Sequence, residues 1–121
     1  MISTVFAQEF AQEWVASWNS HDLDRVMSHY ADDFEMTSPF IATLMQEATG
    51  TLKGKEKVRA YWAAALERLP DLTFELIDIL ISVDSITIYY NAVLGRRAAE
   101  VFFFDGNRKV KQSIAHYNLE R

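Results

Sequence analysis

The chain has 121 residues, of which half are hydrophobic and none is cysteine, and its net charge at pH 7 is −5. This length and apolar content support one folded domain over residues 1–121, and they exclude an intrinsically disordered chain. No basic stripe is present to neutralise phosphates, so we expect neither nucleic acid nor membrane as a partner. The lack of cysteine excludes disulfides and thiolate chemistry. No signal peptide or membrane-spanning run is visible, so we expect a cytoplasmic protein.

Apolar periodicity predicts three helices in the first 69 residues. Four large aromatic residues recur at intervals of four, as in an amphipathic helix: Phe6, Phe10, Trp14 and Trp18. This helix is predicted over residues 5–19, and a shorter one over residues 22–30 carries Tyr30 on its apolar face. The clearest helix is predicted over residues 55–69, with Trp62 on its apolar face.

The segments around the third helix predict a sheet. Residues 34–38 alternate like a short strand that Pro39 stops, and residues 40–53 are predicted as a loop over the mouth of the fold, with room for one helical turn. Four strand-like runs follow the third helix, separated by hairpin-type turns, over residues 72–83, 86–94, 98–104 and 109–119. Helices first and long strands last predict an α+β fold, with a curved antiparallel sheet packed on three helices. Such a sheet with bulky walls leaves a cleft in which a small apolar ligand can bind.

Three segments carry a resemblance to a known family. Residues 18–34, WNSHDLDRVMSHYADDF, resemble the signature of the SnoaL-like polyketide cyclase group of the nuclear transport factor 2-like superfamily. Residues 52–62, LKGKEKVRAYW, and the last strand ending at Tyr117 are similar to the same family. The resemblance implies a cone-shaped α+β barrel with an interior pocket, and often a homodimer formed through the outer face of the sheet. It leaves the activity open, because one scaffold hosts many functions.

Ketosteroid isomerase is a member of that superfamily, and the resemblance to its site implies three corresponding positions. Its oxyanion-hole tyrosine corresponds to Trp14, its general-base aspartate to Ser38, and its protonated strand aspartate to Glu100. A serine hydroxyl cannot abstract a carbon-bound proton near neutral pH without a partner base. The resemblance therefore implies a pocket that keeps one carboxyl, at Glu100, and lacks the isomerase's base.

Glu100 is the strongest candidate for chemistry, because it lies in the apolar run Ala98–Phe104. If its side chain points inward, burial disfavours the charged form and raises its pKa, which suits a carboxyl that donates a hydrogen bond or acts as a base. The alternative is that Glu100 faces solvent or pairs with Arg96 or Arg97 at the hairpin turn.

His116 and Tyr117 are the other catalytic candidates, and as neighbours on one strand they point to opposite faces. The expected register at the 105–109 turn gives Glu100 the following companions on the inner face: Lys111, Ser113, Ala115 and Tyr117. The outer face, expected to form a homodimer interface, carries Val101, Phe103, Val110, Ile114 and His116. A register slip of one residue would exchange His116 and Tyr117, so both remain candidates.

Five further residues are candidates for lining the pocket and contacting substrate: Trp14, Tyr30, Ser38, Trp62 and Tyr90. Plain core packing explains each aromatic residue equally well, but together they predict an aromatic wall suited to a ring-bearing ligand. By alternation at least one of residues 89–91 points inward, and which one is left open. The three histidines lack metal-ligand spacing, and we expect no metal and no cofactor.

Two functions fit these features. The first is an isomerase-, cyclase- or hydrolase-type enzyme that acts on a small hydrophobic molecule through Glu100. The second is a non-catalytic ligand-binding or dimeric interaction module. They are separated by whether a second titratable group lies beside Glu100.

Overall fold

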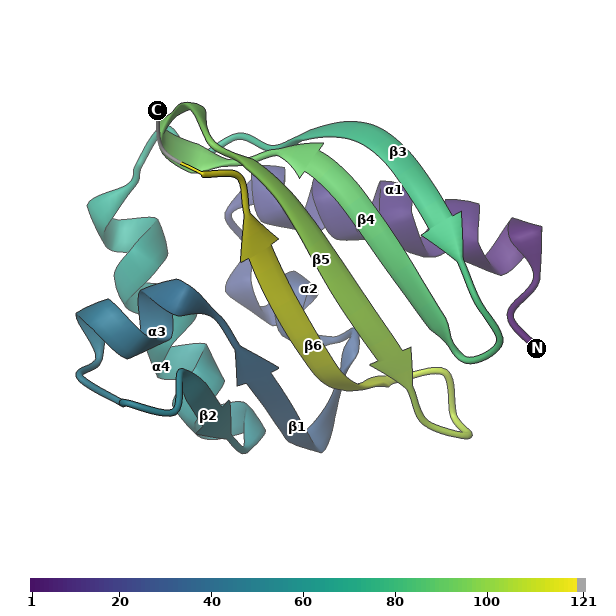
Figure 1. The fold of residues 1–121 in the computed structure, drawn as a ribbon, viewed down its shortest axis with the longest axis horizontal. Helices are drawn as coiled ribbons and strands as arrows, with labels where there is room; N and C mark the ends of the chain where they lie inside the picture. Colours follow the sequence, from purple (N-terminus) through teal and green to yellow (C-terminus); the bar gives the residue numbers. More distant parts are fainter. Residues whose placement is uncertain (120–121) are drawn as a thin grey trace.

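Six strands form one curved, open sheet with helices on one of its faces (Figure 1). The computed structural model describes residues 1–119. The helices are α1 (Thr4–Ser20), α2 (Leu23–Met27), α3 (Pro39–Leu44) and α4 (Lys55–Arg68), and a 3-10 turn, η1, spans Val93–Gly95. The strands are β1 (Tyr30–Thr37), β2 (Thr51–Lys53), β3 (Glu75–Ile81), β4 (Ser85–Asn91), β5 (Arg97–Phe104) and β6 (Val110–Tyr117). Their order in the sheet is β2-β1-β6-β5-β4-β3, which confirms the predicted α+β class.

Helix α1 runs along one face of the sheet, as its periodicity predicts (Figure 1). It begins after Ser3, whose hydroxyl accepts a hydrogen bond from the backbone N–H of Phe6 at 3.1 Å. This is the usual way to satisfy a free N–H at a helix start. The helix ends at Ser20 and is followed by the capping residue His21, which adopts a left-handed conformation with φ of 59°. On its buried face, Phe10 and Trp14 meet rings of β4 and β5, whereas Trp18 meets Trp62 of α4.

The second helix is shorter than predicted, because α2 ends at Met27 and Tyr30 opens β1. The predicted helix over residues 22–30 is therefore wrong at its end, and Tyr30 reaches the core from a strand. Strand β1 pairs in parallel with β6, and the backbone N–H of Val110 donates to the carbonyl of His29 at 2.9 Å. This pairing with a distant segment overrides the local helical periodicity.

The predicted loop over residues 40–53 contains two short elements, α3 and β2. The hydroxyl of Ser38 accepts a hydrogen bond from the N–H of Phe40 at 3.2 Å and caps α3, while Pro39 occupies the first helical turn. The backbone N–H of Ser38 donates to the carbonyl of Gly50 at 2.9 Å, so the segment folds back on itself. Backbone groups therefore bind both the hydroxyl and the N–H of Ser38.

Strands β5 and β6 form the hairpin that positions the main candidate residues. Glu100 lies opposite Ala115 and Ala98 lies opposite Tyr117, which is the predicted register. A bulge between Phe103 and Phe104 changes the register near the turn. Two predictions are wrong for this reason: Val110 is fully buried on the inner side rather than on the outer face, and Lys111 is exposed.

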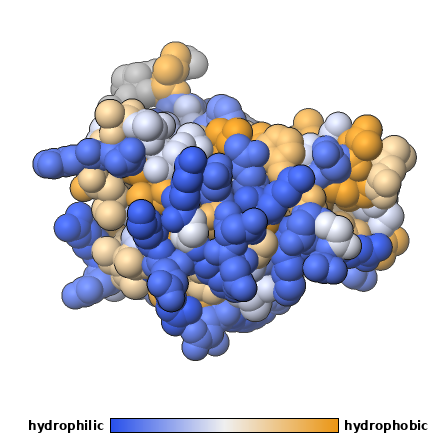
Figure 2. All heavy atoms as spheres, turned by 90° about the horizontal axis from the view of Figure 1, so that it is seen from below, coloured by the Kyte–Doolittle hydropathy of each residue, from blue (hydrophilic) through white to orange (hydrophobic). Residues whose placement is uncertain are grey.

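The surface seen from below is mostly hydrophilic, and hydrophobic residues gather at its right-hand end (Figure 2). Figure 1 places the N-terminus and the β3–β4 hairpin at this end, where Val5, Ile81 and Val83 are exposed. The backbone N–H of Ile2 donates to the carbonyl of Val83 at 3.0 Å and joins these two segments. Within residues 1–119, no helix has the length and apolar content needed to cross a membrane.

Candidate functional site

A cavity of about 340 Å³ lies between the helices and the inner face of β4, β5 and β6. Its wall is largely aromatic: Trp14, Trp18, Trp62, Phe74 and Tyr90. Trp14 stacks on Phe74 with ring centroids 5.5 Å apart, and Trp18 meets Trp62 edge-on at 5.1 Å. These ring–ring contacts hold the aromatic side chains in place, so the cavity wall offers well-ordered apolar surfaces to a ligand.

Glu100 supplies a buried carboxyl to the cavity lining. It lies in the middle of β5 between Ile88 of β4 and Ala115 of β6, and only 3% of its surface is exposed. The hydroxyl of Tyr90 donates to Oε1 at 3.2 Å, whereas Oε2 is buried without a hydrogen-bond partner among the described residues. Burial raises the pKa of Glu100 to about 7, and the neighbouring hydroxyls of Tyr90 and Ser113 limit the rise. Near neutral pH this carboxyl therefore exists in both protonation states.

Two more phenols, Tyr61 and Tyr117, share the cavity lining with Glu100. Burial raises the pKa of each phenol, and the nearby Ser38 hydroxyl acts in the opposite direction on both. The charge of Glu100 raises both pKa values further. These phenols therefore stay protonated at neutral pH and can donate hydrogen bonds to a ligand oxygen.

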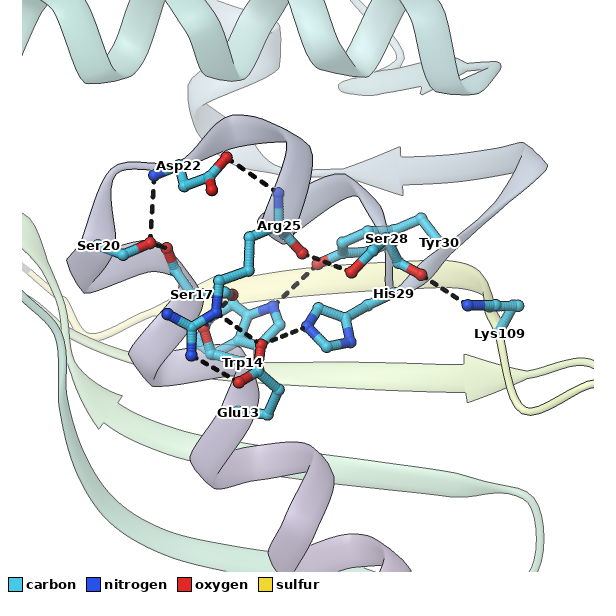
Figure 3. A network of polar contacts seen from close by, with 10 residues as sticks. All are labelled: Glu13, Trp14, Ser17, Ser20, Asp22, Arg25, Ser28, His29, Tyr30 and Lys109. Atoms are coloured by element: carbon cyan, nitrogen blue, oxygen red, sulfur yellow. Dashed lines mark hydrogen bonds and ion pairs between the residues drawn. The ribbon is translucent and has the colours of Figure 1, made fainter.

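Tyr30 lies behind the cavity wall rather than in it. The indole N–H of Trp14 donates to the Tyr30 hydroxyl at 2.9 Å, and both side chains are buried (Figure 3). Tyr30 also packs against Phe34 and Trp62, with centroids 4.4 and 4.9 Å away. Tyr30 therefore helps to fix the orientation of Trp14, and the Trp14 ring, not Tyr30, lines the cavity.

An ion-pair network joins α1, α2 and the turn that follows α2 (Figure 3). Glu13 accepts hydrogen bonds from Arg25 Nε at 3.0 Å and Nη2 at 2.6 Å, and its Oε2 lies 3.3 Å from His29 Nε2. Burial lowers the pKa of His29, against the opposing effect of Glu13. None of these three residues lines the cavity, and the Glu13–Arg25 pair links α1 to α2.

The structure brings most of the candidate residues together in this cavity. Its lining includes six of them: Trp14, Ser38, Trp62, Tyr90, Glu100 and Tyr117. His116 lies elsewhere, because it is exposed on the opposite face of the sheet, next to Tyr117 in sequence. Of the two neighbours, Tyr117 is the one that shares the inner face with Glu100.

Several lining residues were not singled out from the sequence, among them Tyr61, Arg68, Phe74 and Leu94. Tyr61 had a visible signal, because it precedes Trp62 on the apolar side of the third predicted helix. Phe74 lay inside the strand predicted over residues 72–83, but β3 begins only at Glu75, so alternation did not indicate where the Phe74 side chain points.

The chemistry open to this site follows from its polar groups. Among the described lining residues, Glu100 is the carboxylate, and no imidazole accompanies it. No group of three or more histidine, aspartate or glutamate side chains within residues 1–119 could hold a metal ion. The titratable neighbours of Glu100 are phenols, which donate hydrogen bonds and do not act as bases near neutral pH.

The curved sheet with helices on one face is the architecture of the nuclear transport factor 2-like proteins. The chain belongs to the SnoaL-like domain family, whose model matches residues 11–116. No curated protein matches it.

Solved structures show how widely this fold is shared. A SnoaL-like protein of unknown function from Burkholderia thailandensis E264 is 51% identical, with 98% of each chain covered and a TM-score of 0.96. AclR from Streptomyces galilaeus, a proposed hydroxylase, is 18% identical, with 96% of this chain and 91% of that chain covered and a TM-score of 0.72. A proposed polyketide cyclase from Sinorhizobium meliloti is 9% identical, with 95% of this chain and all of that chain covered and a TM-score of 0.75. At such low identities these last two similarities establish the fold alone.

Proposed function

We propose that the cavity binds a small, largely apolar, ring-bearing molecule and that Glu100 exchanges a proton with it, as in an isomerase or cyclase. The observation that carries this proposal is the Glu100 carboxyl, buried among aromatic side chains and with its pKa raised to about 7. A general acid or base works best when its pKa lies near the operating pH. The related folds carry different described activities, so the proposal depends on this residue rather than on them.

The titratable group beside Glu100 is a phenol, Tyr90, rather than a second base, and one carboxyl assisted by phenols is enough for a proton transfer within a substrate. The Glu100 carboxylate would take a proton from a carbon next to a carbonyl group, and the bonding electrons would move onto the carbonyl oxygen as an enolate. A phenol such as Tyr117 or Tyr61 would donate a hydrogen bond to that oxygen. The protonated Glu100 would then return the proton to the same or another carbon, which restores the carboxylate and leaves no net change of charge.

A second candidate function is ligand binding without turnover. It is favoured by the lack of a second base among the described lining residues, where ketosteroid isomerase has an aspartate and this chain has Ser38. In that case Glu100 would only hydrogen-bond the ligand, through its buried Oε2 atom, which has no hydrogen-bond partner among the described residues.

We further propose that the protein forms a homodimer through the outer face of the sheet. Val101, Phe103 and Ile114 lie side by side there on β5 and β6, on the side of the sheet opposite Glu100. Apolar side chains in a row on an open sheet face are more stable when a partner covers them.

Hydrogen–deuterium exchange in 2-tetralone separates catalysis from binding. This bicyclic ketone has acidic protons next to its carbonyl group, and NMR in D₂O reports how fast they exchange. We expect the protein to accelerate exchange and the Glu100→Gln variant to lose at least about 100-fold of that acceleration. The matched control is Glu9→Gln, because Glu9 is exposed on α1 and is not part of the cavity lining.

The outcomes distinguish the two functions. If 2-tetralone quenches the fluorescence of Trp14, Trp18 and Trp62 but does not exchange faster, the protein binds without turnover. If exchange is accelerated equally by the wild type and the Glu100→Gln variant, the assigned role of Glu100 is wrong.

A further inference from the structure

We propose that the ligand is a ring-bearing carboxylate or similar organic anion, and that Arg68 binds its anionic group at the mouth of the cavity. This inference rests on the proposed function, because it takes the cavity as the binding site. It adds the chemical class of the ligand, the direction in which the ligand lies, and a residue that determines specificity.

Arg68 lies where the cavity opens. It is the last residue of α4, its side chain is exposed, and it lines the cavity. It also lines an adjoining hollow of about 360 Å³ that is bounded by residues 68–73 and 92–94. The guanidinium therefore belongs to the border between the aromatic cavity and an outer, solvent-facing hollow.

No carboxylate of the described residues forms an ion pair with Arg68. Among the residues that the structure describes, no carboxylate lies within 4 Å of its guanidinium, although Asp71 lines the same hollow. Two other arginines of the helical layer are paired, Arg25 with Glu13 and Arg59 with Asp24. An unpaired guanidinium next to an apolar cavity is suited to a carboxylate, which it can hold through two parallel hydrogen bonds.

The distribution of charge along the cavity determines the direction of the ligand. Arg68 and Glu100 are the two charged residues of the described lining, one exposed and the other buried. An anionic group placed beside Glu100 would raise the cost of ionising that carboxyl and would lose its own hydration. The favourable arrangement keeps the anion at Arg68, in contact with water, and directs the neutral, carbonyl-bearing end of the ligand toward Glu100.

The cavity lining also carries exposed apolar residues, of which Leu94 borders the same outer hollow as Arg68. Leu44, Met45 and Leu94 line the cavity and are among the most exposed large apolar residues of the described chain. Leu94 is 78% exposed and has a left-handed backbone with φ of 58°. Exposed apolar side chains next to an unpaired cation match an amphiphile with an apolar body and one charged end.

Two probes that differ only in charge test this inference: 2-naphthoate and 2-naphthamide. Binding is followed by quenching of tryptophan fluorescence, because all three tryptophans of the chain line the cavity. We expect the wild type at low salt to bind 2-naphthoate more tightly than 2-naphthamide. Arg68→Gln should weaken 2-naphthoate binding roughly fivefold and leave 2-naphthamide binding unchanged.

Two further variants make the test specific. Lys57→Gln removes the same charge from an exposed position on α4 outside the cavity lining, and it should change neither affinity. Arg68→Glu should reverse the preference, so that 2-naphthylmethylamine, a cation, binds better than 2-naphthoate. Circular dichroism confirms that the variants keep the fold, which an exposed helix-end substitution should not disturb.

The results separate the two proposals. If 2-naphthamide binds and Arg68→Gln leaves the 2-naphthoate affinity unchanged, the assignment of Arg68 is overturned while the cavity remains a binding site. If Lys57→Gln weakens 2-naphthoate binding as much as Arg68→Gln does, the effect is one of net charge and the assignment is again overturned. If neither probe binds the wild type, the proposed function fails, and this inference fails with it.

Discussion

Replacing Glu100 by glutamine should make the protein more stable at neutral pH, although it removes a candidate catalytic group. Glutamine has nearly the same shape and carries no charge. The pKa of Glu100 is about 7 in the folded protein, against an ordinary value of 4.5. Since the folded pKa is the higher one, the folded state holds the proton more tightly, and wild-type stability falls as pH rises from about 4.5 to about 7. At about 1.4 kcal/mol per pKa unit, the loss amounts to roughly 3 kcal/mol.

Urea unfolding at a series of pH values between 4 and 8.5 measures this loss. The free energy of unfolding of the wild type, minus that of Glu100→Gln, should fall by roughly 3 kcal/mol across this range and level off above pH 8. The matched control, Glu9→Gln, removes an exposed carboxylate from α1 and should track the wild type. A constant difference between the wild type and Glu100→Gln at all pH values would show that Glu100 is not held in an apolar environment.

Three other predictions follow from the contacts. Tyr90→Phe removes the hydrogen bond to Glu100 Oε1, so the pKa of Glu100 should rise further and the stability should fall by about 1 kcal/mol, as measured by carboxyl carbon NMR and urea unfolding. Glu13→Gln should lower the pKa of His29 in a proton NMR titration, because in the wild type Glu13 opposes the effect of burial on that pKa. The half-exposed Glu13–Arg25 pair should contribute less than about 1 kcal/mol to the free energy of unfolding. Phe103→Glu should convert a dimer into a monomer in light scattering at micromolar concentration, and a monomeric wild type would contradict the proposed interface.

Helices α1 and α4 and the long strands could be predicted from local patterns, because their apolar spacing repeats over several turns or residue pairs. The predictions fail where the pairing of strands that are distant in sequence determines the local structure. Tyr30 belongs to a strand because β1 pairs with β6, which lies some 80 residues further along the chain. The β-bulge near Phe104 moves Val110 inward, and a bulge has no periodic signal. Beyond the bulge the two strands pair in the register predicted from alternation, so Glu100 and Tyr117 lie on the same face, as expected.

The candidate site also contains residues that local patterns predict and residues that they do not. Glu100, Tyr90 and Tyr117 were accessible to sequence reasoning because strand alternation decides which side chains share a face. The exclusion of His116 depended on the register of the same hairpin, which only the structure provides. Arg68 could not be found, because a charged residue at a helix end is ordinarily solvated, and its position beside the cavity depends on the end of α4 and η1 bordering the same hollow.

The central claim is that Glu100 is a carboxyl that titrates near neutral pH at a ligand site, and a pH titration of its side-chain carbon by NMR tests this most directly. The measurement is made on the free protein and again with saturating 2-tetralone. We predict a midpoint near 7 in the free protein and a higher midpoint with the ketone bound, since the apolar ligand removes the carboxyl further from water. A midpoint near 4.5 in the free protein, or one that does not move when the ketone binds, would contradict the account.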